Sequence, residues 1–258
     1  MSIQQIENRI SALQKQKKKL FIPYVMCGDG GFVKTAEIIR LLEKSGASII
    51  EIGIPFSDPI ADGPIIQAAG QRALDSGVTL KSIVTFLKDL PPANNVPRIM
   101  MTYLNPILQY GYEAFFSDIK DAEISGVIIP DLPLEEYDVI NPFTSKYNIA
   151  IIPLIAPSTN LERLDKILHK ANGFIYTVTV NGTTGERKGF PDEVLLRLSS
   201  IKKHTNMPVV AGFGVSTQAH IDTLSAHCDG VVVGSKIVAL AHKNEYDAIQ
   251  DFVKGMNK

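Results

Sequence analysis

Eight short apolar runs, each followed by a longer segment of helical periodicity, constrain the possible fold more strongly than any other feature of this sequence. The runs are rich in β-branched residues and apolar almost throughout, as is typical of parallel strands that are covered on both faces. We predict these strands at residues 20–26, 48–54, 98–103, 126–130, 149–155, 174–180, 208–213 and 230–233. The predicted helices are 32–44, 79–90, 112–122, 134–146, 160–170, 191–204, 217–226 and 236–254.

An unbroken alternation of strand and helix leaves two architectures, an open doubly wound sheet or a closed barrel. Eight units in 258 residues favour the closed (βα)8 TIM barrel. A dinucleotide-binding sheet would need a Gly-x-Gly-x-x-Gly turn after its first strand, and Gly28, Gly30 and Gly31 do not have that spacing. No linker or change of composition divides the chain, so we expect one domain over residues 1–258. An additional N-terminal helix, predicted at 3–16, could cover the bottom of the barrel.

The overall charge and the cysteines limit the possible partners and compartments. The 26 Lys and Arg nearly balance the 27 Asp and Glu, so no net field attracts nucleic acid or an anionic membrane. No apolar stretch approaches the length of a membrane span. Lys17, Lys18 and Lys19 precede an apolar run as in a signal peptide, but the run is short and contains Pro23, which favours a buried strand. Two cysteines without a CxxC spacing suit a reducing compartment, and we expect a cytoplasmic protein.

The second predicted strand carries one carboxylate, Glu51, in the middle of an aliphatic run. Burying an unpaired carboxylate is costly and raises its pKa. A carboxyl group with a raised pKa is what a general acid or base needs near neutral pH. A structural glutamate that pairs with a lysine or arginine, or that points outward, would give the same sequence pattern. Both interpretations stay open at this point.

Two loops after strands carry polar residues of the kind that active sites use. The loop after the second strand contains two prolines with Asp58 and Asp62. Asp58 before a proline is typical of a turn residue, whereas Asp62 suits either a helix N-cap or a functional carboxylate. The loop at 181–189 is rich in glycine and polar residues, which predicts either a mobile lid or a disordered surface loop.

Glycine turns follow the seventh and eighth predicted strands, at Gly212 to Gly214 and at Gly234 with Ser235. Such a pair is the recurrent phosphate site of barrels, because glycines and helix starts direct backbone N–H groups at an anion. No lysine ends a strand, which argues against a Schiff-base aldolase. The five histidines fall in predicted helices or at their ends and show no metal-binding spacing, so we predict no metal site.

The segment from Ile50 to Gly63, IEIGIPFSDPIADG, closely resembles the signature of the tryptophan synthase alpha subunit family. The match extends over nearly the whole chain and includes the motifs FIPY at 21–24, YLNP at 103–106, PDLP at 130–133, TTG at 183–185, GFG at 212–214 and GS at 234–235. The resemblance implies a lyase that splits indole-3-glycerol phosphate into indole and glyceraldehyde 3-phosphate. This reaction needs no lysine or metal, because the protonated indole ring accepts the electrons of the broken bond.

The resemblance also implies roles for particular residues. Glu51 would be the acid and base that delivers the proton to indole C3, and Asp62 would bind the indole N–H and stabilise its developing positive charge. Thr184 would meet Asp62 when the lid closes. The phosphate would be held by Gly185, Phe213, Gly214, Gly234 and Ser235. The indole pocket would be lined by Tyr24, Tyr103, Ile128, Leu154 and Tyr176, together with Phe213, although plain core packing would also explain these apolar and aromatic residues.

The family works with a beta subunit that carries pyridoxal phosphate, usually as an alpha2beta2 heterotetramer, and this chain would itself hold no cofactor. The positions that would face the partner are Pro55, Asp58, Pro59, Asn105 and Leu108. The nearest alternative is a free-standing indole-3-glycerol phosphate lyase. Two further alternatives are a metal-dependent aldolase or isomerase that uses Glu51, Asp58 and Asp62 as oxygen ligands, and a non-catalytic phosphate-binding barrel.

Overall fold

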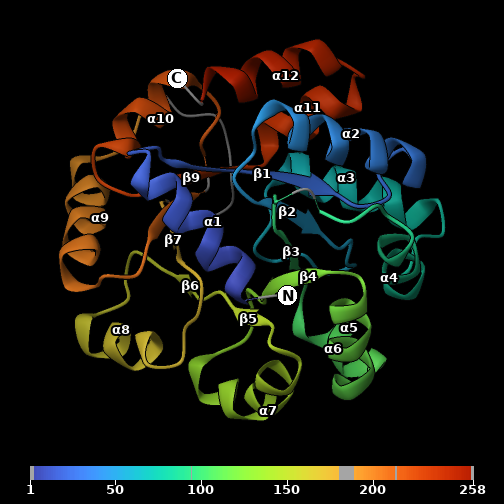
Figure 1. The fold of residues 1–258 in the computed structure, drawn as a ribbon, viewed down its shortest axis with the longest axis horizontal. Coiled ribbons are helices and arrows are strands. Elements are labelled where there is room, and N and C mark those ends of the chain that lie inside the picture. The colour runs from blue at the N-terminus through green and yellow to red at the C-terminus, as the bar shows by residue number, and fades with distance from the viewer. Residues whose placement is uncertain (1–2, 94, 180–188, 213, 257–258) are drawn as a thin grey trace.

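The computed structural model describes residues 3–93, 95–179, 189–212 and 214–256, and its strands form one sheet in which every pairing is parallel (Figure 1). The spatial order of the strands is β5-β4-β3-β2-β1-β9-β8-β7-β6. Their bounds are β1 Leu20–Met26, β2 Ile50–Gly53, β3 Arg98–Met101, β4 Ile124–Ile128, β5 Ala150–Ile151, β6 Leu154–Ile155, β7 Ile175–Val178, β8 Val209–Gly212 and β9 Gly230–Val233.

The fifth predicted strand appears as two pieces, β5 and β6, which are separated by Ile152 and Pro153. Proline has no N–H to donate to a neighbouring strand. The hydrogen bonding nevertheless continues around this point, because the N–H of Ile152 donates to the Val127 carbonyl and the N–H of Tyr176 donates to the Pro153 carbonyl, each at 3.0 Å. The two end strands of the sheet are therefore one continuous segment that closes the barrel. The predicted (βα)8 barrel is confirmed.

The helices surround the barrel in a ring, apart from the first, which crosses one end of the barrel (Figure 1). They are α1 Ile3–Lys15, α2 Phe32–Ser45, α3 Pro64–Asp75, α4 Leu80–Lys88, α5 Leu104–Tyr110, α6 Tyr112–Asp121, the 3-10 turn η1 Leu134–Glu136, α7 Tyr137–Tyr147, α8 Leu161–Leu168, α9 Asp192–His204, α10 Gln218–Ser225, α11 Ser235–His242 and α12 Tyr246–Gly255. Thr79, Asn160 and Thr217 each accept a backbone N–H at the start of a helix, as N-cap residues do.

The prediction of one helix over 236–254 was wrong. The chain forms α11 and α12 instead, and Asn244 between them has a φ of 59°. This left-handed conformation ends a helix, and asparagine tolerates it better than most residues. Two helices, α3 and α5, were not among the predicted helices, although a helix N-cap at Asp62, just before α3, was one of the two interpretations of that residue. Both helices begin close behind the polar loops that mark the carboxyl ends of β2 and β3.

Apolar side chains fill two layers, one between the strands and the ring of helices and one inside the barrel. The lower end of the inner layer is covered by α1, as predicted for the N-terminal helix. Its Ile6, Ile10 and Leu13 are buried against the inner layer. The Arg9 guanidinium donates to the carbonyl oxygens of Ala47 and Ser48, at 3.0 and 3.2 Å, and ties α1 to the chain just before β2.

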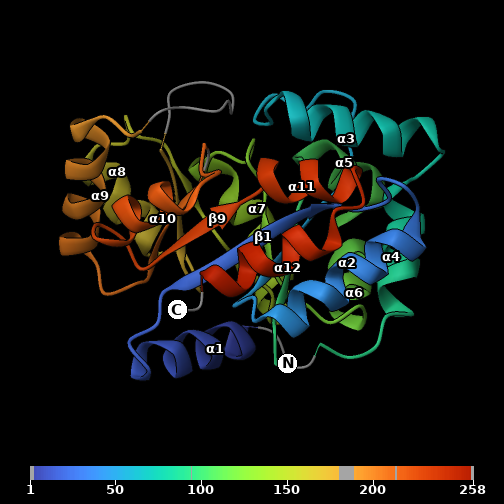
Figure 2. The same cartoon turned by 90° about the horizontal axis from the view of Figure 1, so that it is seen from above.

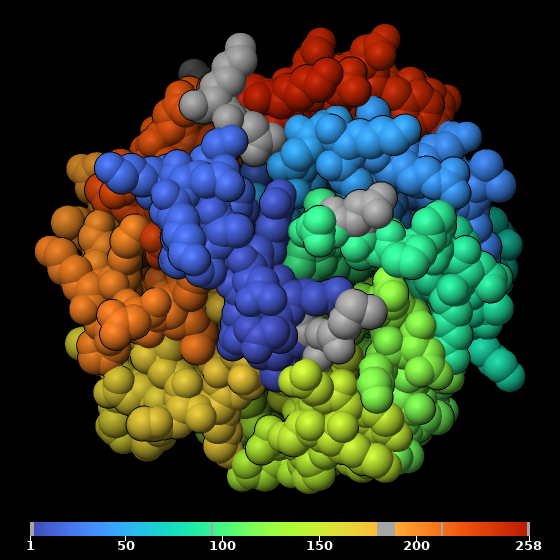
Figure 3. Space-filling view, in the orientation of Figure 1, coloured from blue at the N-terminus to red at the C-terminus, as the bar shows by residue number. Residues whose placement is uncertain are grey.

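The figures show how α1 lies relative to the barrel. In Figure 2, α1 lies below the strands and α3 lies on the opposite side. In Figure 3 the dark-blue N-terminal segment lies across the centre of the visible face. The amino-terminal ends of the strands are thus covered, and the carboxyl-terminal ends are left for a site.

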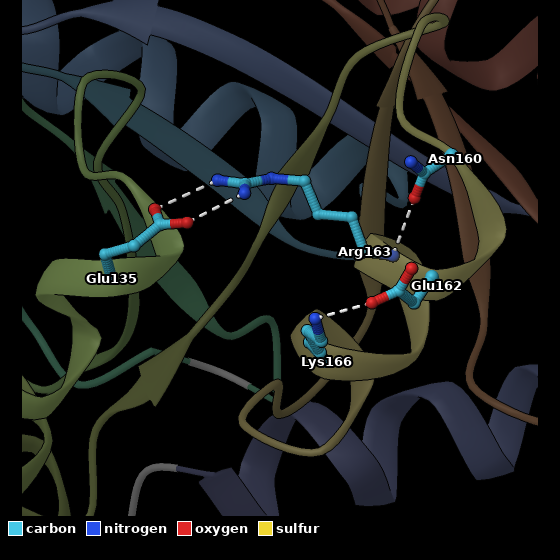
Figure 4. A network of polar contacts seen from close by, with 5 residues as sticks. All are labelled: Glu135, Asn160, Glu162, Arg163 and Lys166. Atoms are coloured by element: carbon cyan, nitrogen blue, oxygen red, sulfur yellow. Dashed lines mark hydrogen bonds and ion pairs between the residues drawn. The ribbon is translucent and has the colours of Figure 1, made fainter.

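An exposed polar network joins the segments that follow β4 and β6 (Figure 4). Arg163 of α8 makes two hydrogen bonds, of 2.8 and 3.0 Å, to the carboxylate of Glu135 in η1. This paired geometry is stronger than a single contact between exposed charges, and it lowers the pKa of Glu135 to about 2. The Asn160 side chain accepts the backbone N–H of Arg163 at 2.8 Å, so the same arginine also marks the start of α8.

Across the described residues, we find no helix that combines the length and the hydropathy required to cross a membrane.

Candidate active site

A cavity of about 250 Å³ opens at the carboxyl ends of the strands. Its walls come from β1, β2, β3, β7 and β9, from the loop after β2 and the segment 214–216 after β8, from the first turn of α3, and from α11 with the turn behind it. Catalytic residues of (βα)8 barrels lie at this end of the strands. Of the predicted site residues, Glu51, Asp62, Tyr24, Tyr176, Gly214, Gly234 and Ser235 line the cavity.

Glu51 points into the barrel from β2. It pairs in register with Tyr24 of β1 and Ile99 of β3, and both of these side chains belong to the inner layer. The residue is 1% exposed, and neither carboxyl oxygen has a hydrogen-bond partner among the described residues. Burial, together with the nearby charge of Asp62, raises the pKa of Glu51 to about 8. A structural ion pair at Glu51 is thus not observed in the described part of the chain.

Asp62 lies in the loop after β2 and is held by Tyr103. The Tyr103 hydroxyl donates to Asp62 Oδ2 at 3.2 Å and accepts the Ala61 N–H at 3.0 Å. Burial raises the pKa of Asp62 to about 6, against the opposing effect of the Tyr103 hydrogen bond, which favours the ionised form. The N-cap residue of the following helix, α3, is Gly63, and no side chain caps it. Asp62 is therefore a cavity carboxylate and not a helix cap.

Tyr103 was predicted to line the indole pocket; it is not among the residues that line this cavity, and its buried side chain supports Asp62. Its ring stacks on Phe56 with the centroids 5.0 Å apart. Ile128 and Leu154 are also not among the residues that line this cavity; Ile128 belongs to the inner layer, and the partly buried Leu154 packs against that layer. No pattern in the sequence indicates the contact of Tyr103 with Asp62, because the two residues are 41 positions apart in the chain.

Tyr24 and Tyr176 reach the cavity because glycines make room for their rings. A Cβ atom added at Gly53 of β2 would lie 1.8 Å from the Tyr24 hydroxyl oxygen. A Cβ atom added at Gly212 of β8 would lie 2.3 Å from the Tyr176 ring. Any larger residue at either glycine would displace an aromatic ring from the cavity wall.

The other end of the cavity suits an anion. Gly234 is the N-cap residue of α11, no side chain caps this helix, and Gly234 and Ser235 line the cavity. The first N–H groups of a helix carry a partial positive charge and bind anions. Gly214 also lines the cavity, with a φ of 77°, but the next helix, α10, begins only at Gln218. Of the two predicted glycine turns, only the one at Gly234 leads directly into a helix.

Three residues predicted for the phosphate site and the lid, Gly185, Phe213 and Thr184, lie outside the described residues. Several cavity residues were missed by the sequence analysis, among them the charged Lys236, Lys243 and Glu245. Lys236 stands in the first turn of α11 and lines the cavity. The positive end of the helix dipole disfavours a cation in the first turn of a helix. An anion bound between the Lys236 ammonium and the N-terminus of α11 would therefore stabilise both of these positive groups. A lysine after a Gly-Ser turn could have suggested this from the sequence.

Asp58, the third carboxylate of the predicted metal-ligand alternative, does not line the cavity. It is exposed and accepts a hydrogen bond from the Ser57 hydroxyl at 2.6 Å. Within the described ranges, no three His, Cys, Asp or Glu side chains are grouped so that they could hold a metal ion. Of the other residues predicted to face a partner, Asn105 and Leu108 are exposed, Pro59 is half-buried and Pro55 is buried.

A closed barrel, two buried carboxyl groups with different acidities and a helix N-terminus across one cavity together define a (βα)8-barrel enzyme that handles a small anionic molecule. A family model described as Tryptophan synthase alpha chain matches residues 10–257. The chain belongs to the tryptophan synthase alpha chain family, which confirms the resemblance seen in the sequence, and it is a lyase.

Relatives and solved structures agree with this assignment. The chain is 50% identical over 246 residues to the tryptophan synthase alpha chain of Bacillus thuringiensis (strain Al Hakam), with 95% of each chain covered. A structure from Aquifex aeolicus VF5 superposes with a TM-score of 0.91 at 32% identity, covering 100% of this chain and 98% of that one. A structure of Mycobacterium tuberculosis tryptophan synthase gives a TM-score of 0.90 at 28% identity, with 98% and 96% covered.

Proposed function

We propose that this chain cleaves indole-3-glycerol phosphate to indole and glyceraldehyde 3-phosphate, with Glu51 as the proton donor and acceptor. The observation that supports these residue roles is that two buried carboxyl groups in one cavity have different pKa values. Burial raises the pKa of Glu51 to about 8 and that of Asp62 to about 6. At neutral pH one acid keeps its proton while the other is ionised, which is the pattern of a paired acid and anion in catalysis.

The reaction begins with protonated Glu51. It gives its proton to C3 of the indole ring, which places a positive charge on the ring nitrogen. The bond between C3 and the side chain then breaks, and its electron pair returns to the ring. The hydroxyl on the released carbon becomes an aldehyde as its proton passes to the Glu51 carboxylate. Glu51 ends in the protonated state in which it began, and atoms and charges balance.

Ionised Asp62 binds the indole N–H and stabilises the positive charge that develops when C3 is protonated. Tyr103 keeps Asp62 in place through its 3.2 Å hydrogen bond and favours the charged form of the carboxylate. Tyr24 and Tyr176 provide the apolar and aromatic walls against which the indole ring packs. Thr184 would contact Asp62 when the loop that carries it closes over the substrate.

The phosphate binds at the N-terminus of α11, where Gly234 and Ser235 supply backbone N–H groups. Gly214 lines the same cavity. Gly185 and Phe213 complete this set as predictions from the family match. The phosphate position fixes the far end of the substrate, so the indole ring is directed toward Glu51 and Asp62.

The partner of the chain is a tryptophan synthase beta subunit, in an alpha2beta2 heterotetramer to which indole is passed. The pyridoxal phosphate belongs to that partner, and this chain holds no cofactor of its own. Asp58, Asn105 and Leu108 form an exposed surface on the loop after β2 and on α5 that suits docking. A cytoplasmic location agrees with the free cysteines Cys27 and Cys228, both of which are buried.

The experiment that tests this function measures the release of indole from indole-3-glycerol phosphate, with and without the cognate beta subunit. We expect slow turnover by the chain alone and strong activation by the partner. Full activity that the beta subunit does not change would favour the free-standing lyase. No indole in either assay would reject the proposed reaction.

A further inference from the structure

The hydroxyl of Tyr24 occupies a place on β2 that a side chain would otherwise fill. Tyr24 of β1 pairs in register with Glu51 of β2. The Tyr24 hydroxyl oxygen lies 1.8 Å from the position of a Cβ at Gly53, so it stands where a side chain of residue 53 would begin. Residues two apart on a strand point to the same face. The hydroxyl therefore lies beside Glu51 on the inner face of β2, one step nearer the mouth of the barrel.

The two neighbouring groups have complementary needs. The Tyr24 hydroxyl is directed to the sulfur of Met26 at 3.9 Å, and a thioether is a weak acceptor. Tyr24 is 5% exposed, so its hydroxyl is buried with a poor partner. Glu51 is buried with no hydrogen bond to either carboxyl oxygen among the described residues. The Tyr24 hydroxyl, a donor without a good acceptor, thus lies beside the Glu51 carboxyl group, which has no donor among the described residues.

This inference rests on the proposed function and adds a residue to it. We propose that Tyr24 is a positioning residue for Glu51, and that its hydroxyl donates a hydrogen bond to the Glu51 carboxylate whenever Glu51 has given its proton to the substrate. A hydrogen bond from a neutral donor to a charged acceptor is stronger than the bond to sulfur that it replaces. Burial and the nearby Asp62 and Glu51 raise the pKa of Tyr24 well above its ordinary value, so the phenol keeps its proton throughout.

Other titratable groups also face this part of the cavity. Asp62 approaches from the loop after β2, and Tyr103 reaches Asp62 from behind. The remaining titratable lining residues, taken from the described chain, are Tyr176 of β7 and, from α11 and the turn behind it, Lys236, Lys243 and Glu245. Tyr176 is the competing donor. Its ring lies over Gly212 of β8, on the opposite side of β1 and β9 from β2, whereas Tyr24 lies over β2 itself.

The test is Tyr24→Phe, which removes one hydroxyl and keeps the ring that fills the space over Gly53. A donor to the carboxylate lowers the pKa of Glu51, so its loss should raise that pKa by about one unit and lower kcat by about tenfold or more, with little change in KM. The alkaline limb of the pH–rate profile, where activity falls as Glu51 loses its proton, should move to higher pH. Tyr137→Phe on α7 is the matched control, because it removes a buried phenol hydroxyl outside the cavity and should leave that limb in place. Tyr176→Phe is measured beside it to test the competing donor, whose pKa is raised by burial and by the nearby charge of Glu51.

A second readout does not depend on catalysis. The pKa of Glu51 is about 8 in the folded protein and about 4.5 in the unfolded chain, so between pH 4.5 and pH 8 the folded protein binds one more proton than the unfolded chain does. The contribution of protonated Glu51 to the free energy of unfolding is therefore fully present below about pH 4.5 and is lost as the pH rises to about 8. In Tyr24→Phe this loss should continue to higher pH, and in Glu51→Gln it should be absent.

The outcomes separate the two proposals. An unchanged alkaline limb and an unchanged stability window in Tyr24→Phe would overturn the role of Tyr24, even where Glu51→Gln has no activity. A shift produced by Tyr176→Phe and not by Tyr24→Phe would assign the role to Tyr176. Absence of indole release by the wild-type protein would reject the proposed function, while the stability window would still decide whether Tyr24 bonds to ionised Glu51.

Discussion

At the scale of single residues, the surroundings of Glu51 and Asp62 determine which of the two carries a proton. Both are buried, but among the described residues a hydrogen-bond donor, the Tyr103 hydroxyl, reaches Asp62 and none reaches Glu51. Hydrogen bonds to a carboxylate favour its charged form, and burial without such bonds favours the neutral form. The different acidities of these two chemically similar side chains therefore follow from the deeper burial of Glu51, from the charge of Asp62 beside it, and from the Tyr103 hydrogen bond to Asp62.

These acidities predict the pH dependence of the lyase reaction. Activity requires Asp62 ionised and Glu51 protonated, so kcat/KM should rise as pH passes about 6 and fall as it passes about 8. The measurement is the initial rate of indole release from low substrate concentrations across that range. Because the two carboxyl groups interact, the apparent pKa values of the two limbs belong to the coupled pair and not to Asp62 or Glu51 alone. A rate that kept rising above pH 9 would contradict the role of Glu51 as the acid.

Replacing Glu51 with glutamine tests the proton transfer directly. The amide has nearly the same shape as the acid but cannot give a proton, so Glu51→Gln should lower kcat by about 10²–10⁴-fold. Its fold and its affinity for inorganic phosphate should stay close to those of the wild type. Asp62→Asn, which removes the charge opposite the indole N–H, should be nearly as damaging. Retention of more than about a tenth of the wild-type rate by Glu51→Gln would reject its role.

Sequence reasoning could single out Glu51 for a local reason, because a lone carboxylate in an aliphatic run is visible without any knowledge of the fold. It missed the support of Asp62 by Tyr103 because that contact joins two loops and exists only once β2 and β3 are paired. Lys236 was missed although the start of α11 was predicted to within one residue. A lysine in the first turn of a helix has the pattern of an ordinary surface residue until the cavity beside it is known.

At the scale of elements, the strands were easier to predict than the helices. The apolar runs at β1 and β9 gave the observed bounds, because strands covered on both faces must be apolar throughout. The periodicity across 236–254 continued through the turn at Asn244, so α11 and α12 appeared as one helix. The short helix α5 contains Pro106 and only seven residues, which left too little pattern to recognise.

The helix α5 also carries a prediction about the partner. Leu108 is 48% exposed on α5, next to the exposed Asn105. An aspartate at an apolar docking position loses packing and leaves a charge buried in the interface. Leu108→Asp should raise the beta-subunit concentration needed for half-maximal activation by about tenfold or more, and the rate of the isolated chain should stay unchanged.

The matched control for that variant is Leu196→Asp on α9, where the leucine is 69% exposed and lies away from the loop after β2. It introduces the same charge and should leave activation by the beta subunit at the wild-type level. Equal effects of the two substitutions would mean that α5 is not part of the docking surface. The concentration dependence of indole release measures both variants.

At the scale of the whole molecule, stability and catalysis are assigned to opposite ends of the barrel. The helix α1 covers one end, and Glu51, Asp62 and the start of α11 lie at the other. Ile10 of α1 is 4% exposed. Ile10→Ala should lower the free energy of unfolding by about 2–5 kcal/mol, because it removes buried methylene groups and leaves a cavity.

Denaturant unfolding measures that loss, and the kcat/KM of the folded fraction of Ile10→Ala should equal that of the wild type. Ser11→Ala, at the exposed neighbouring position of α1, is the control and should change neither quantity. A substantial fall in kcat/KM of folded Ile10→Ala would show that the two ends of the barrel are coupled. In that case the packing of α1 would have to be included in any account of catalysis.

The apolar layer between α1 and Glu51 has a further consequence for the reaction. Ile22, Ile49 and Ile99 fill this space, and hydrocarbon groups relay no protons. A catalytic acid that lies above such packing cannot be reprotonated through the interior of the barrel. The proposed cycle meets this condition, because the hydroxyl proton of each substrate molecule restores the proton that Glu51 gave to the ring. The enzyme thus returns to its starting charge after every turnover without a water-filled path through the barrel.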